Sequence, residues 1–344
     1  MIAAADVRRT PKDVRAAYLV VQDLMAPDPQ RYWIELLRTS LLAWTAFLAA
    51  CWLAPGSAWM ILATVAAVLL WYRASFMIHE LTHQRRDQIP AFHTAWNLLV
   101  GVPILLPSIF YEGVHQYHHK KSTYGTAEDP EYMAMAGRPW KTGAFLLASF
   151  LQPPLLMLRF LVGVPVSWVR AKLRRRLFKY GSAYTIRPIF TRKTTPEEER
   201  EIVQWEFVIL AVWTPLLAAT YSEFLPWRWL VIWYVVYSGL MLVNRIRMAC
   251  AHRFESTGEK IGHWEQFADS IDTPGGWPAE LIAPLGSKYH ALHHLFPSLP
   301  FHNAKRAYER LVEAGPAHLD YRKSTSRSFA KSMASLLGSR RTPT

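Results

Sequence analysis

Histidines in three short clusters are the residues best suited to chemistry in this chain. Eight of its 13 histidines lie in His79–His83 (HELTH), His115–His119 (HQYHH) and His290–His294 (HALHH). On a helix, residues three or four positions apart share a face, so each cluster can direct its imidazoles toward one point. Neutral imidazole is the commonest metal ligand and suits iron, zinc and copper. Eight converging imidazoles exceed the needs of one tetrahedral zinc ion and are enough for two metal ions.

The first cluster also matches H-E-x-x-H, the motif in which two histidines bind Zn²⁺ and the glutamate is a general base. A zinc intramembrane protease would need only one further ligand and would leave the histidines of the other two clusters without a role. A metal transporter or sensor would need ligands spaced along a path through the membrane. A di-metal centre is therefore favoured over these alternatives.

Uncharged segments must position the clusters. Residues 39–72 carry no charge and are interrupted by Pro55-Gly56, while residues 207–222 and 229–244 flank Pro226. A spanning helix needs about 20 mostly apolar residues, and basic side chains at its ends can reach the membrane surface. The pattern predicts an all-α integral membrane protein with four transmembrane helices in two hairpins, at about 39–73 and 205–246.

Two weaker apolar segments, 94–111 and 142–158, contain prolines that disfavour a straight span. We expect interfacial or re-entrant helices there.

The charge distribution suggests how the chain is oriented. The net charge is +13, basic residues gather in the connections outside the hairpin turns, and residues 132–196 contain no acid. This positive-inside pattern predicts cytoplasmic termini and basic segments, and it disfavours nucleic-acid binding because the charges follow the membrane edges. A hydrophobic content of 51% excludes a disordered chain. The only cysteines, Cys51 and Cys250, exclude a disulfide scaffold and a cysteine zinc finger.

The sequence resembles the membrane fatty acid desaturase superfamily over roughly residues 39–311. The three histidine clusters have that family's order, and a membrane hairpin fills the gap between the second and third. The H-x₃-H first cluster and the HALHHLFP segment at 290–297 resemble the acyl-lipid branch. Asp129-Pro130 resembles the Asp-Pro that often follows the second cluster.

The resemblance implies a set of metal ligands. Besides the eight clustered histidines, a ninth family histidine often lies at the cytoplasmic end of the last membrane helix, and His252 occupies that place. Four residues before His252, acyl-CoA desaturases carry an asparagine, whereas this sequence has Met248. This difference agrees with the likeness to the acyl-lipid branch. The implied metal ligands are His79, His83, His115, His118, His119, His252, His290, His293 and His294. Ligand histidines usually donate their second N–H to a carboxylate or carbonyl. The carboxylate candidates are Asp129, which is favoured, and Glu80, Glu112, Asp269 and Asp272.

The activity that the resemblance implies is O₂-dependent, non-haem di-iron desaturation of a lipid acyl chain. A lipid or alkane hydroxylase with the same site is the alternative. Zinc can replace iron during purification because it outcompetes ferrous iron at imidazole sites. The sequence has no CxxC, His-Pro-Gly-Gly or GxGxxG motif. Electrons are therefore expected from an external ferredoxin, rubredoxin or cytochrome b5.

The expected organisation has three parts. Residues 1–38 form a cytoplasmic N-terminal segment, 39–311 a membrane domain, and 312–344 a basic C-terminal tail. Within the membrane domain, 74–204 and 247–311 form a cytoplasmic cap that carries the histidines. All clusters must meet on one side, so 94–111 is not expected to cross. The expected location is a bacterial inner membrane, with the active site facing the cytoplasm.

Overall fold

The computed structural model describes residues 11–187, 190–256, 258–314 and 321–338. These residues form helices and connecting loops, and the described chain contains isolated β-bridges but no strand. The predicted all-α membrane class is confirmed.

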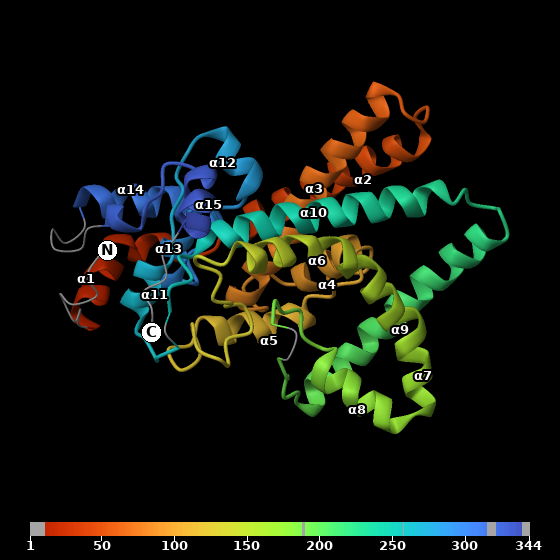
Figure 1. Cartoon of the computed structure of the whole chain (residues 1–344), viewed down its shortest axis with the longest axis horizontal. Coiled ribbons are helices and arrows are strands. Elements are labelled where there is room, and N and C mark those ends of the chain that lie inside the picture. The colour runs from red at the N-terminus through yellow and green to blue at the C-terminus, as the bar shows by residue number, and fades with distance from the viewer. Residues whose placement is uncertain (1–10, 188–189, 257, 315–320, 339–344) are drawn as a thin grey trace.

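Two long helical hairpins form the apolar body. The first pairs α2 (Pro29–Trp52) with α3 (Ala58–His83), and the second pairs α9 (Pro196–Tyr221) with α10 (Arg228–Ala251). Figure 1 shows both hairpin turns far from the end that holds α11, α13 and α14. Both hairpins agree with the sequence prediction, although the helices extend beyond the uncharged segments that predicted them.

Local signals explain where three of these helices begin. The Asp28 carboxylate accepts from the backbone N–H of Gln30 at the start of α2, and the Ser57 hydroxyl accepts from Met60 N–H at the start of α3. A capping box between Thr195 and Glu198 begins α9. Such caps satisfy N–H groups that have no partner within the helix.

A fifth helix, Pro139–Val169, is also long and apolar enough to cross a membrane. It consists of α6 (Pro139–Met157), the π-helical turn η3 (Leu158–Gly163) and α7 (Val164–Val169). The helix continues through Pro153 and Pro154, which were expected to disfavour a straight span. Packing of α6 against α10 supports this continuity. The Tyr234 hydroxyl of α10 donates to the Phe150 carbonyl at 3.2 Å, and this is the carbonyl that Pro154 leaves without its helical donor.

The histidine positions limit how many helices can cross. The second and third clusters contact each other, so an even number of crossings must separate them. Three candidate spans lie between them: Pro139–Val169, Pro196–Tyr221 and Arg228–Ala251. All three cannot cross fully. The tight α9–α10 hairpin favours a Pro139–Val169 segment that does not cross fully, and the count of four spans remains a prediction.

Residues 94–111 form short elements and are not a candidate span. They contain α4 (Phe92–Trp96), the π-helical turn η2 (Asn97–Gly101) and the start of α5 (Ile109–His118). The Asn97 side chain accepts from the Ser108 backbone N–H at 2.7 Å and folds the loop back on itself. This geometry agrees with the expected non-crossing segment.

The remaining elements gather mainly at the histidine-bearing end (Figure 1). They are α1 (Pro11–Val21), η1 (Gln22–Leu24), α11 (His263–Asp269), α12 (Trp277–Ile282), α13 (His290–Leu295), η4 (Phe301–Asn303), α14 (Ala304–Ala314), η5 (Tyr321–Ser324) and α15 (Phe329–Gly338). The basic helix α8 (Ala171–Tyr180) lies apart from them, beside α7. Apolar residues of α1, α13 and α14 share one buried cluster, and α15 packs on α10. The described parts of both predicted terminal segments therefore pack against the membrane domain.

Candidate metal centre

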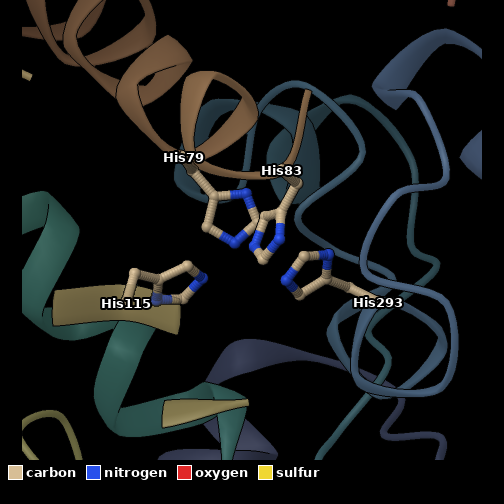
Figure 2. Close-up of side chains that lie close together, drawn as sticks. All are labelled: His79, His83, His115 and His293. Carbon is tan, nitrogen blue, oxygen red and sulfur yellow. The ribbon is translucent and has the colours of Figure 1, made fainter. Parts of the chain in front are cut away.

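Four histidines from three elements form a first group. His79 and His83 come from the last turn of α3, His115 from α5 and His293 from α13. One ring nitrogen from each lies within 4.8 Å of the others. Figure 2 shows the four rings pointing toward one another across a common space. We call this set the first quartet.

Four further histidines form a second group. His118 ends α5, His252 follows α10, and His290 and His294 lie one turn apart on α13. One nitrogen from each again lies within 4.8 Å of the others, and all four residues are buried. We call this set the second quartet.

His119 lies beside both quartets. Its Nε2 is 3.0 Å from Nε2 of His115 and 3.0 Å from Nε2 of His293, both in the first quartet. Its ring centroid is 4.5 Å from that of His294 in the second quartet. The structure therefore brings together all nine histidines predicted from the sequence.

Two buried carboxylates orient histidines of the second cluster. Both Asp129 oxygens lie 3.0 Å from Nδ1 of His118, and the carboxylate also accepts from the backbone N–H groups of Gly125 and Glu131. The Glu131 carboxylate contacts Nδ1 of His115. An Nδ1–H that donates to a carboxylate leaves Nε2 unprotonated and available to a metal.

Asp129 is among the carboxylates predicted from the sequence, whereas Glu131 is not. Glu131 lies two residues after Asp129, across Pro130, so its proximity to the conspicuous Asp-Pro pair was the available signal.

Asp269 and Asp272 support the centre indirectly. Asp269 accepts from the Tyr124 hydroxyl at 2.8 Å, and that hydroxyl lies 3.0 Å from Nδ1 of His252. Asp272 accepts from the backbone N–H groups of Ala291 and Leu292 at the start of α13.

Glu80 and Glu112 do not bond to a clustered histidine. Glu80 accepts from the Tyr32 hydroxyl at 2.7 Å and from Phe301 N–H, and its nearest approach to His79 is 3.9 Å. Glu112 pairs with Arg86 at 3.0 Å. The expectation for Glu112 is corrected because α5 turns this side chain away from the histidines toward a cation.

Burial keeps most of these imidazoles neutral. Outside the spanning helices, burial lowers the pKa of six histidines: His115, His119, His252, His290, His293 and His294. Burial also acts on His118, but the Asp129 carboxylate raises its pKa above the ordinary value. Neutral imidazoles have the lone pair that a metal ion needs.

The donor set fits two metal ions. Nε2 of His290 lies 2.9 Å from Nε2 of His252 and 3.2 Å from Nε2 of His294. Both ring nitrogens of His79 and Nε2 of His83 are buried without a hydrogen-bond partner within the described chain. Neutral imidazole nitrogens that converge in this way direct their lone pairs toward a common point, as metal ligands do. The two quartets therefore offer sites for two metal ions.

An all-helical body with membrane-spanning candidates and a buried, all-imidazole centre defines a histidine-rich membrane metalloprotein. The family model described as fatty acid desaturase matches residues 52–326. This chain belongs to the fatty acid desaturase family, whose members are membrane di-iron oxidoreductases. Membership of a family of membrane di-iron enzymes favours a di-metal centre over the zinc protease suggested by the H-E-x-x-H match in the first cluster.

A curated relative gives a finer comparison. A protein named ceramide hydroxylase, from Caulobacter vibrioides (strain NA1000 / CB15N), is 36% identical over 316 residues. The match covers 90% of this chain and 88% of the relative. The similarity therefore includes both hairpins and all three histidine clusters.

Proposed function

We propose that this chain is an O₂-dependent di-iron hydroxylase of ceramide or a closely related long-chain lipid. The observation that carries the proposal is the likeness to a ceramide hydroxylase over 90% of this chain. This likeness supports the hydroxylase alternative, and we prefer it to acyl-chain desaturation.

We assign the two iron ions to the two quartets, with His119 between them. Iron held there would supply the oxidising power needed to attack an unactivated C–H bond with O₂. The protein residues keep the imidazoles neutral, fix their rings through Asp129 and Glu131, and bury the centre away from water. Excluding water protects a reactive oxidant from side reactions.

Desaturation of a lipid acyl chain is the second candidate. The family model and the resemblance of the third cluster to acyl-lipid desaturases support it. Both reactions use the same oxidant and donor, and the product distinguishes them. Hydroxylation adds one oxygen atom, whereas desaturation removes two hydrogen atoms.

We further propose that the centre faces the cytoplasm of a bacterial inner membrane and receives electrons from a separate ferredoxin, rubredoxin or cytochrome b5. The positive-inside pattern supports this side, and cationic α8 suits an acidic donor. We also propose the division of the chain into an N-terminal segment (1–38), a membrane domain (39–311) and a basic C-terminal tail (312–344).

The test expresses the wild type in a bacterial host with a ferredoxin system, supplies ceramide, and analyses extracted lipids by mass spectrometry. His118→Ala/His119→Ala removes two candidate ligands, and His263→Gln is a control outside both quartets. We expect oxygenated ceramide from the wild type and the control, and none from the double variant. A new double bond would support the desaturase candidate. No product from iron-loaded wild type, with either ceramide or acyl lipids, would contradict both.

A further inference from the structure

Arg247 is a buried cation beside the metal centre. It lies on α10, five residues before His252, and is only 5% exposed. Its Nη2 donates to the Asn244 side chain at a long 3.4 Å, and its Nε and Nη1 have no hydrogen-bond partner among the described residues. Its guanidinium carbon lies 4.9 Å from the centroid of the Phe76 ring. No carboxylate of the described chain forms an ion pair with it.

Such an arrangement costs stability. The desolvation of the guanidinium is only partly repaid, because Arg247 has the Phe76 ring, one long hydrogen bond to Asn244 and the attraction of the nearby Glu131 carboxylate, but no ion pair within the described chain. Two metal ions nearby would add further repulsion. A buried ionisable residue of a membrane helix is a candidate for function for this reason.

Arg245 provides an internal comparison. It lies two residues earlier on α10 and is also buried, at 9% exposed. Its Nη1 donates to the Phe145 carbonyl at 2.8 Å, and its Nη2 donates to Gln152 Oε1 at 3.2 Å. Arg245 therefore joins α10 to α6 through two hydrogen bonds, whereas the hydrogen bond of Arg247 to Asn244 is a long one within its own helix.

The Arg247 side chain lines a narrow cavity that reaches both quartets. The cavity measures about 20 Å³, which is room for one water molecule. Its other polar lining residues include His79, His115, His118, Tyr111 and Glu131. Tyr111 and Glu131 are both engaged with His115 Nδ1, and the unpartnered ring nitrogens of His79 and His290 belong to candidate metal ligands. Among the lining residues outside the two quartets, Arg247 therefore has N–H groups without a hydrogen-bond partner in the described chain.

We propose that Arg247 donates hydrogen bonds to an acceptor oxygen of the lipid substrate, and that the oxidised carbon lies within a few bonds of this oxygen. The proposal rests on the proposed function and names its substrate class more closely. Guanidinium is a donor only, with a rigid fork of N–H groups, so it is suited to a carbonyl or hydroxyl oxygen. A plain methylene chain would leave the buried cation unpaired. The substrate is therefore oxidised near its polar end, and ceramide offers an amide carbonyl and hydroxyls there.

Binding experiments test Arg247 separately from turnover. Iron-loaded wild type, Arg247→Met and Arg247→Lys are titrated with ceramide and with an n-alkane of similar length, without O₂ or reductant, and binding is followed by native mass spectrometry. We expect Arg247→Met to bind ceramide about 10- to 100-fold more weakly, since hydrogen bonds to charged groups have this strength. Alkane binding should not change, and Arg247→Lys should recover part of the ceramide affinity.

Thermal unfolding and iron content separate recognition from a structural role. Without lipid, Arg247→Met should unfold at the same or a higher temperature, because an unpaired buried charge has been removed. Arg245→Met should unfold at a lower temperature. Unchanged ceramide affinity in Arg247→Met, equal weakening for both lipids, or loss of bound iron would overturn the proposal. Loss of iron would instead mean that Arg247 supports Glu131 and His115.

The two proposals can fail independently. If the wild type binds ceramide through Arg247 but forms no oxygenated product, the proposed hydroxylation fails and the recognition role stands. If ceramide is oxygenated by Arg247→Met at the same carbon and with the same KM as by the wild type, the recognition role fails and hydroxylation stands.

Discussion

Asp129 and Glu112 are two carboxylates close to the second histidine cluster that have different partners. Asp129 is fully buried and lies against His118, whereas Glu112 pairs with the half-exposed Arg86. The first contact orients a candidate ligand. The second is an ion pair near the surface, a kind that contributes little stability. The two residues form a matched pair for mutation.

Asp129→Asn should weaken iron binding about 10- to 100-fold, the usual effect of removing a carboxylate that orients a ligand histidine. Glu112→Gln should retain wild-type iron binding. Iron retained during titration with a chelator, measured by elemental mass spectrometry, compares the two variants. Equal iron retention in both would mean that the His118–Asp129 contact does not support the metal.

The sequence predicted the clustered histidines because helical spacing fixes which side chains share a face. It could not place the carboxylates in the same way, because loops bring them to the centre. Glu131 reaches His115 only through the turn at Asp129-Pro130, and Glu112 is directed elsewhere by its position on α5. Arg247 also escaped prediction, since a basic residue near the end of a membrane helix ordinarily extends to the membrane surface.

At the scale of elements, α13 depends on a residue outside itself. This helix has six residues yet carries three of the nine histidines, and short helices are marginal alone. Asp272 accepts from two backbone N–H groups of its first turn and is fully buried. The loop before α12 therefore caps α13 from a distance.

Asp272→Ala should lower the free energy of unfolding by about 1–2 kcal/mol, as removal of a helix cap does, and should reduce bound iron. Asp272→Asn keeps an acceptor and should lose less of both. Asp87→Ala is a control at an exposed carboxylate that pairs with Arg85. Chemical denaturation and iron analysis provide the measurements. An Asp272→Ala protein with wild-type stability would contradict the capping role.

The hairpins could be predicted from the sequence because long uncharged segments and the turn residues between them, Pro55-Gly56 and Pro226, are local signals. The path through Pro153 and Pro154 could not, because packing of α6 on α10 overrides the local preference of proline. The π-helical turn that follows these prolines has no clear sequence signature either.

At the scale of the whole molecule, contact between the second and third clusters restricts the topology. It requires residues on either side of Pro139–Val169 to lie on one side of the membrane if the α9–α10 hairpin crosses twice. The chain enters this segment after Lys121 and leaves it before Lys172, so these two lysines report its path.

Labelling with a membrane-impermeant thiol reagent tests which helices make up the four predicted spans. Lys121→Cys, Lys172→Cys and Phe224→Cys are placed singly in a Cys51→Ser/Cys250→Ala background. All three positions are exposed. The first two should react from one side and the third, in the α9–α10 turn, from the other. Reaction of Lys172→Cys from the same side as Phe224→Cys would mean that α9 does not cross, and it would refute the α9–α10 hairpin as two of the four spans.

Charge on α8 predicts a salt effect on turnover. This helix has no buried residue and carries several cations, so an acidic electron donor would be attracted to it. Raising ionic strength should slow reduction by the donor, and Arg175→Glu/Lys179→Glu should slow it at low salt. Lys305→Glu on α14 is the control. Rates that do not depend on salt would argue against an electrostatic encounter at α8.

On the proposed assignment of one iron ion to each quartet, the two quartets also determine the order in which the centre can assemble during synthesis. A nascent chain that has not reached residue 290 already contains His79, His83 and His115 of the first quartet, but only His118 and His252 of the second. Each quartet is completed by α13, so tight capture of either ion follows translation of nearly the whole membrane domain. Because three histidines of the first quartet but only two of the second precede α13, the first quartet should gain affinity for iron before the second. A chain that ends before α13 should not retain both iron ions.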